Sequence, residues 1–206
     1  MKKTVLLIGL LLIAVFIFAS CEKAPSKDPA VSEESEDIDH AASEESEGLD
    51  YIIDKEAGSV KISGRGDCHD AKIVIPKQIM GYPVTGIAKE AFKDDVNLIG
   101  IVFPQSVISI GRTAFYNCSD LASITIPDGV TSIEKQSFWF CESLTSVTIP
   151  DSVTRIGGYV FYECGNLTDI TYQGTKAQWN AISKDGYWNY STGSYTIHCT
   201  DGDIAK

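Results

Sequence analysis

The side chains best equipped for chemistry in this chain are its cysteines and histidines. Two Cys–His pairs are adjacent in the sequence, Cys68 with His69 and Cys199 with His198. Zinc prefers cysteine sulfur and histidine nitrogen, so the two pairs together have the composition of a zinc site. Whether they can meet depends on how the chain between them folds.

Three further cysteines recur at a fixed interval and are called the cysteine column below: Cys118, Cys141 and Cys164 are each 23 residues apart. Regular spacing could serve redox chemistry, but free cysteine is also a small residue that fills a core. In stacked repeats the Cβ vectors of equivalent residues run side by side, which disfavours disulfides between them. We therefore predict that the cysteine column consists of buried, unpaired thiols.

The same interval of 23 residues governs the apolar residues and predicts the fold. A unit such as Leu121-x-x-Ile124-x-Ile126 ends in a short strand, and Pro127 then interrupts strand pairing. The Phe138-x-x-Cys141 spacing suits one helical or 3₁₀ turn that directs both side chains inward. One unit cannot enclose its own apolar residues, whereas stacked units form a parallel sheet around a shared core. The repeating apolar columns are Phe92, Phe115, Phe138 and Phe161; Leu98, Leu121, Leu144 and Leu167; Ile101, Ile124, Val147 and Ile170; and Ile87, Ile110, Ile133 and Ile156.

The folded domain is predicted to span residues 51–206, with 23-residue repeats over 76–171 and a cap at each end. Residues 51–75 suggest an entry hairpin around Gly58-Ser59, and 172–206 suggest a short helix followed by a closing strand. The first repeat is five residues longer than the later ones. Stacking at about 4.8 Å per coil separates the two Cys–His pairs by roughly 20–25 Å, which excludes a shared zinc site.

Residues 124–133 and 147–157 resemble the BspA-type leucine-rich repeats of bacterial surface proteins, and residues 172–179 are similar to the cap that often ends them. The resemblance extends over roughly residues 58–202. It implies a leucine-rich-repeat solenoid exposed on a cell surface, and adhesion to host proteins or to other cells. It implies no shared ligand-contacting residue, because the repeat defines only the frame.

The N-terminus has the pattern of an export signal. Lys2 and Lys3 precede a run without charge over residues 4–20, and Phe18-Ala19-Ser20-Cys21 resembles the bacterial lipobox. We predict a lipoprotein signal peptide over 1–20 and lipidation of Cys21, which would anchor the protein to a membrane. The alternative is an uncleaved N-terminal anchor. Both place the folded part outside the cytoplasm, at the bacterial cell membrane or outer surface.

Residues 21–50 are predicted to be a disordered acidic linker. The stretch contains eleven acidic residues against two lysines, so it holds most of the chain's net charge of −11. Few apolar residues and strong self-repulsion favour an extended spacer over a cation site made of clustered carboxylates. An acidic chain also repels phosphate backbones, so nucleic acid is not an expected partner.

Aromatic residues follow the inward phenylalanines at equivalent positions. Tyr116, Trp139 and Tyr162 should form a strip along one side of the solenoid, with Phe140 beside them. Such a strip could contact a ligand, or its rings could pack over one another and seal the surface. A second row projects from the predicted sheet, and it is either a binding face or an ordinary choice of strand-forming residues. That row comprises Val102, Thr125, Thr148 and Thr171.

No familiar catalytic or phosphate-binding motif is present in the sequence, so we predict a protein that is not an enzyme and needs neither cofactor nor metal. The first functional hypothesis is a binding or adhesion module for an extracellular or host-surface protein. The alternative is a structural envelope protein that binds glycan or cell wall.

Overall fold

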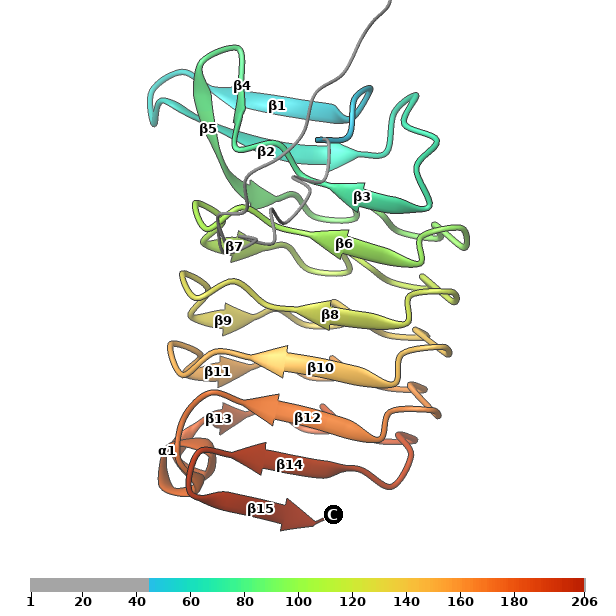
Figure 1. The fold of residues 1–206 in the computed structure, drawn as a ribbon, viewed down its shortest axis with the longest axis vertical. Helices are drawn as coiled ribbons and strands as arrows, with labels where there is room; N and C mark the ends of the chain where they lie inside the picture. Colours follow the sequence, from blue (N-terminus) through green and yellow to red (C-terminus); the bar gives the residue numbers. More distant parts are fainter. Residues whose placement is uncertain (1–44, 206) are drawn as a thin grey trace, which may run out of the picture. The chain divides into compact units, whose positions relative to one another are not determined.

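The computed structural model describes residues 45–205, and in this part of the chain successive coils stack along one axis (Figure 1). The register is the predicted one, because Ile124 pairs with Val147 and Val147 with Ile170 in adjacent parallel strands. The predicted solenoid of 23-residue repeats is therefore confirmed. The predicted signal peptide, Cys21 and the linker up to residue 44 lie outside the described residues.

One side of the solenoid is a sheet in which strands from successive coils pair in parallel, and the prolines end these strands as expected. β3 and β6 form its N-terminal part as a separate pair, and β8 begins the continuous sheet. The final pair, β14 with β15, is antiparallel and closes this side. These strands are β3 (Lys72–Val74), β6 (Gly100–Val102), β8 (Ser123–Thr125), β10 (Ser146–Ile149), β12 (Asp169–Tyr172), β14 (Thr196–Cys199) and β15 (Gly202–Ala205).

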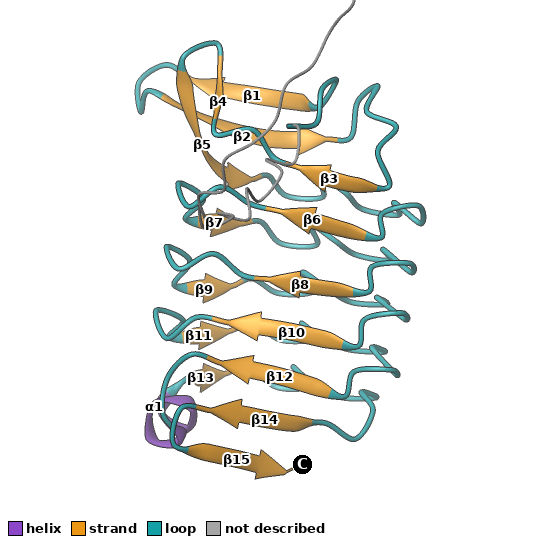
Figure 2. Cartoon of the chain, viewed as in Figure 1, coloured by secondary structure: helices purple, strands orange, loops and turns teal. Residues whose placement is uncertain are grey.

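The chain returns along the opposite side, which forms a second sheet of shorter strands. Its order is β1-β2-β5-β7-β9-β11-β13, with β4 beside β5, and it is parallel except for the antiparallel pairs β1–β2 and β4–β5. Figure 2 shows that strands and loops make up the repeats, and that the single helix of the described part, α1 (Lys176–Ala181), lies at the C-terminal end. The strands are β1 (Asp50–Asp54), β2 (Ser59–Gly64), β4 (Gln78–Ile79), β5 (Tyr82–Ile87), β7 (Ser109–Ile110), β9 (Ser132–Ile133), β11 (Arg155–Ile156) and β13 (Ser183–Lys184).

The core between the sheets is a set of ladders in which equivalent residues touch from coil to coil. Phe92, Phe115, Phe138 and Phe161 are fully buried, and their rings stack with centroids 5.4, 5.4 and 5.7 Å apart. Offset stacking of this kind stabilises each neighbouring pair by about 0.5–1.5 kcal/mol beyond the burial of apolar area. The columns predicted from the sequence are therefore the core.

A third side, made of turns, joins the two sheets. The Cys141 N–H donates to Phe138 O at 3.4 Å and both side chains are buried, so the predicted inward turn of the 3₁₀ type is confirmed, but it does not extend into a helix. The Trp139 N–H donates to Gln136 O within the coil at 3.4 Å, whereas the next N–H, that of Phe140, donates to Tyr162 O in the following coil at 3.0 Å. Gln136 and Phe140 adopt left-handed backbone conformations, with φ of 63° and 60°. Hydrogen bonds of the 3₁₀ type therefore alternate with bonds between coils, and no helix propagates.

The N-terminal end of the described chain confirms the predicted entry hairpin and shows that the folded domain begins before residue 51. β1 pairs antiparallel with β2, as expected for the hairpin around Gly58. Ser46 and Leu49 are buried, and the Ser46 N–H donates to Val74 O at 2.8 Å. The packed chain thus begins before residue 51, which corrects the linker prediction for residues 45–50.

The longer first repeat and the C-terminal cap are built largely as expected. The five extra residues form the hairpin of β4 and β5, with Met80 and Gly81 at its tip. Thr175 caps α1 through a reciprocal bond with Gln178, which satisfies backbone donors at the helix start. The predicted closing strand is β14, but β15 follows it and was not predicted.

Candidate functional site

The structure brings Tyr116, Trp139 and Tyr162 together on the turn side of the solenoid. The Trp139 ring lies 5.6 Å from the Tyr116 ring and 5.2 Å from the Tyr162 ring, both edge to face. All three side chains are half-buried. They therefore support one another while each keeps part of its surface accessible.

The strip is wider and longer than the sequence indicated, because the last coil contributes two more rings. Tyr187 stacks on Tyr159 at 5.5 Å, and Tyr190 stacks on Tyr162 at 5.6 Å. The step from Tyr162 to Tyr190 is 28 residues, so a search at an interval of 23 misses it. The first repeat also contains five extra residues, so a search that allowed an interval of 28 residues would have found Tyr190. The name aromatic strip is used below for Tyr116, Trp139, Phe140, Tyr159, Tyr162, Tyr187 and Tyr190.

Three rings of the strip sit on left-handed backbone. Phe140, Tyr159 and Tyr187 have φ values of 60°, 59° and 60°. Left-handed backbone costs an L-residue other than glycine roughly 1–2 kcal/mol, and asparagine tolerates it best. Asn117 occupies the position equivalent to Phe140 one coil earlier. Ring contacts between neighbouring coils offset this cost where an aromatic residue takes the place of asparagine.

Charged groups of both signs border the aromatic strip. Lys93 Nζ lies 5.6 Å from the centre of the Tyr116 ring, and Lys135 Nζ lies 5.6 Å from the centre of the Tyr159 ring. The coil of Tyr159 also contains Glu163, whose N–H donates to Tyr190 O in the last coil. Shielding from water and the nearby Glu163 carboxylate raise the pKa of the Tyr162 phenol. Ammonium groups thus lie over the rings of Tyr116 and Tyr159, and a carboxylate lies beside the ring of Tyr162.

The Trp139 indole lies among four other rings of the strip. It contacts the rings of Tyr116, Phe140, Tyr159 and Tyr162. Its Nε1 atom is buried and has no hydrogen-bond partner among the described residues. A buried donor without a partner carries a desolvation cost of about 1–3 kcal/mol, which a ligand acceptor reaching this atom would remove.

The cysteine column is buried and unpaired, as predicted. The Sγ atoms of Cys118, Cys141 and Cys164 each donate to a carbonyl of the preceding coil, over 3.0, 3.2 and 3.1 Å. Burial raises the pKa of the Cys164 thiol to about 12, and it raises the pKa of the other two as well. Such thiols are inert, because the thiolate is the reactive form.

The two Cys–His pairs lie at opposite ends of the stack, as the repeat predicts, because Cys68 precedes β3 and Cys199 ends β14 (Figure 1). His198 lies between the carboxylates of Asp169 and Asp203. Its Nε2 atom is 3.1 Å from Asp169 Oδ1, and its Nδ1 atom is 3.0 Å from Asp203 Oδ1. Both hydrogen bonds raise the pKa of His198, and the bond with Asp169 has the larger effect.

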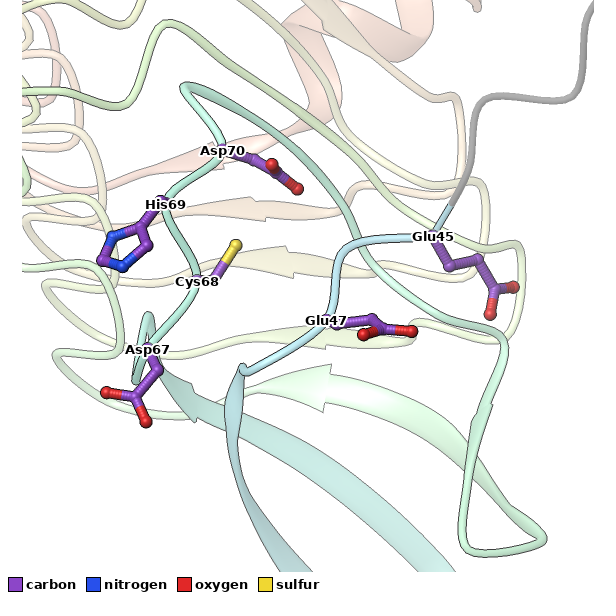
Figure 3. A pocket seen from close by; sticks show the side chains of 6 residues that line it. All are labelled: Glu45, Glu47, Asp67, Cys68, His69 and Asp70. Atoms are coloured by element: carbon purple, nitrogen blue, oxygen red, sulfur yellow. The ribbon is translucent and has the colours of Figure 1, made fainter.

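An acidic depression of about 800 Å³ surrounds Cys68 and His69. Figure 3 shows that Asp67 and His69 point away from Glu45 and Glu47, so these groups share no centre. Asp70 accepts a hydrogen bond from the Ser46 hydroxyl at 2.6 Å, which ties the incoming chain to the first coil. Among residues 45–205 no group of three or more metal-ligating side chains has a geometry that could hold an ion.

The row of Val102, Thr125, Thr148 and Thr171 projects from the strands β6, β8, β10 and β12, with Thr148 half-buried and the others exposed. It lies on the sheet side, apart from the aromatic strip on the turn side. No helix within residues 45–205 is long and apolar enough to cross a bilayer.

The stacked coils, their shared core ladders and the absence of a long helix in the described part define a β-solenoid repeat protein. Residues 85–201 match the model of the BspA type leucine rich repeat region, with six copies of the repeat. The chain belongs to this family, and the resemblance stated from the sequence is confirmed.

Solved structures of bacterial leucine-rich repeat proteins agree with this assignment. The Leucine Rich Repeat protein of T. pallidum is 34% identical with a TM-score of 0.56, and the match covers 63% of each chain. A leucine rich cell surface protein of Faecalibacterium prausnitzii is 32% identical with a TM-score of 0.51, covering 70% of this chain and 44% of that one. A leucine-rich repeat protein of Bacteroides capillosus is 28% identical with a TM-score of 0.56, covering 62% and 95%.

This chain therefore spans less than two thirds of the length of the first two proteins. A comparison with curated proteins gives no match.

Proposed function

We propose that this protein is a lipid-anchored module of the bacterial surface that binds a protein ligand on the aromatic strip. The observation that carries the proposal is the strip itself, a row of partly accessible rings held in place by ring contacts between coils. Tyrosine and tryptophan offer large contact areas with few rotatable bonds, so they lose little entropy on binding. They are accordingly enriched among the residues that dominate protein interfaces.

The enclosed geometry of the strip favours a protein ligand over a sugar. Sugars stack on open ring faces, but the Trp139 ring is half-buried and already stacks on Phe140 and Tyr159. A protein side chain can fill the spaces between such rings. Binding is favoured over catalysis by the state of the cysteine column, whose thiols are buried hydrogen-bond donors rather than nucleophiles.

Two observations support surface anchoring. Residues 18–21 resemble a lipobox, and one similar solved structure is described as a cell surface protein. The 23 residues between Cys21 and Glu45 can reach at most about 80 Å when extended, enough to hold the solenoid well clear of a bilayer. The change Cys21→Ala is expected to abolish acyl labelling and to leave the protein unprocessed or released. Undiminished labelling of this variant would refute the anchor.

The binding proposal is tested with the full chain against a panel of extracellular matrix and host-surface proteins. Trp139→Ala combined with Tyr116→Ala should weaken binding at least 30-fold, the effect of losing about 2 kcal/mol at an interface hot spot. Tyr51→Ala is the matched control, because Tyr51 is exposed on β1 at the far end of the domain. Circular dichroism confirms that each variant folds. Saturable binding that the double variant leaves unchanged would exclude the strip.

A second candidate function, binding of glycan or cell wall, is favoured by the threonine row on the sheet side. Thr125 and Thr171 present hydroxyl groups at regular steps on an open face, which suits a polar polymer. Binding to isolated cell wall or to a glycan array, with the protein panel silent and the strip variants without effect, would favour this candidate.

A further inference from the structure

The aromatic strip ends in two tyrosines that are far more accessible than its other rings. Tyr187 is 60% exposed and Tyr190 is 55% exposed. Each uses one ring face to stack on the preceding coil, with interplanar angles of 18° and 20°. The opposite faces are directed away from that coil. The two rings also meet each other edge to face, at 5.8 Å and 83°, so together they form an aromatic corner.

The fold explains why this corner is open. Elsewhere in the strip, each ring contacts a ring of the next coil. β13 is the last strand of its sheet, and the chain beyond Tyr190 crosses to β14 and β15 in the other sheet. Within residues 45–205 no further coil therefore follows on the turn side, and the stack ends without a partner ring.

The same strip already shows which group such a face accepts. Lys93 and Lys135 each place an ammonium group over a tyrosine ring at 5.6 Å, which is the geometry of a cation–π interaction. Near the open corner the nearby charged groups differ. Glu163 lies in the coil on which Tyr190 stacks, and Asp185 precedes Tyr187 by two residues and pairs with Arg155. The open faces of the two rings carry the negative end of the ring quadrupole, which attracts a cation.

We propose that the corner of Tyr187 and Tyr190 binds an arginine side chain of a protein ligand. This inference rests on the proposed function and names the chemistry of its ligand. Arginine fits better than lysine because a planar guanidinium can lie flat on one ring face and stack over its whole area, whereas an ammonium group is a compact point charge. The ligand segment would thus continue the stack where the solenoid stops, and the net acidic charge of the chain favours a basic partner.

The test measures binding of a capped nine-residue probe of alternating glycine and arginine to the immobilised full chain. Two matched probes carry lysine or the neutral isostere citrulline in place of arginine. Tyr187→Asn removes one ring while suiting the left-handed backbone, and Tyr190→Leu removes the other while keeping an apolar side chain. Tyr51→Leu, an exposed tyrosine on β1, is the control.

Each ring variant should weaken the arginine probe roughly fivefold, and the pair of changes together roughly 25-fold. Citrulline should weaken binding at least about tenfold, lysine less, and Tyr51→Leu should have no effect. Equal binding of the arginine and citrulline probes, or no response to either ring variant, would overturn the inference. Concentration-dependent self-association that disappears in both ring variants would also overturn it, because a second copy would then occupy the corner.

The two proposals fail in different ways. If a protein ligand depends on Trp139 but not on Tyr187, Tyr190 or its own arginines, the inference fails and the proposed function stands. If the arginine probe binds the corner while the protein panel remains silent, the corner is a site and the proposed function fails.

Discussion

Replacing Phe140 by asparagine tests whether ring contacts hold the aromatic strip together against an unfavourable backbone. Phe140 has a φ of 60°, and its ring contacts those of Trp139, Tyr116 and Tyr162 at 5.4, 5.9 and 6.4 Å. Asparagine stands naturally at the equivalent position 117, so the change Phe140→Asn suits the backbone and removes the ring. The two effects have opposite signs, and their sizes decide the outcome.

The stabilisation from the Phe140 ring contacts is expected to exceed the backbone strain that asparagine would relieve. Three partly exposed ring contacts near the lower end of their usual range stabilise the strip by roughly 1.5–3 kcal/mol. Moving from phenylalanine to asparagine on left-handed backbone regains about 0.5–1 kcal/mol. The net loss of about 1–2 kcal/mol corresponds to a Tm lower by roughly 3–6 °C for a domain of this size.

The assay is thermal unfolding followed by circular dichroism, with Glu163→Asn as the matched control. Glu163 occupies the same position of the next coil, with a φ of 59°, and has no aromatic ring to lose. Its variant should match or exceed the natural chain in Tm. A Phe140→Asn variant as stable as the Glu163→Asn variant would refute the reasoning, because the ring contacts would then contribute nothing measurable.

Two further predictions follow from the titrating groups. The pKa of His198 is raised above its ordinary 6.5 by the Asp169 and Asp203 carboxylates, so this contact stabilises the β14–β15 hairpin fully below pH 6.5 and is lost as the pH rises through the raised value. The protection factors of the hairpin amides, which compare observed exchange with the base-catalysed intrinsic rate at the same pH, should therefore be larger below pH 6.5 than well above it. His198→Gln should remove that difference, and a persisting difference would assign it to other groups. In the folded protein, Cys199, which is half-buried, should react with a thiol reagent before the cysteine column, whose thiols should react only after unfolding. Reaction of the column in the folded state would show that the coils open locally.

The repeat made most of the fold predictable. Phenylalanine, leucine and isoleucine columns at an interval of 23 residues identify the inward positions, because each coil can bury its apolar residues only against equivalent residues of its neighbours. The hairpin at Gly58 and the cap of α1 at Thr175 were visible for a different reason, since turn and cap residues act locally. The lipidation of Cys21 remains a prediction from residues 18–21.

The sequence predicted only the central part of the aromatic strip. Trp139 and its two neighbours in the column share the 23-residue step, but Tyr187 and Tyr190 join the strip after a step of 28 residues. Their register is set by hydrogen bonds between coils, such as that from the Glu163 N–H to Tyr190 O, and a count along the sequence does not contain these. The left-handed backbone of Phe140 could not be predicted either, because it too depends on hydrogen bonds between coils.

The sequence by itself determined the solenoid and its core, because burial of apolar residues repeats with the chain and leaves a periodic trace in it. Only the tertiary structure decided that the strip ends in the open corner of Tyr187 and Tyr190, and that His198 lies between two carboxylates. Those features arise where the repeat stops and the chain crosses from one sheet to the other, and contacts made there join residues whose spacing follows no period.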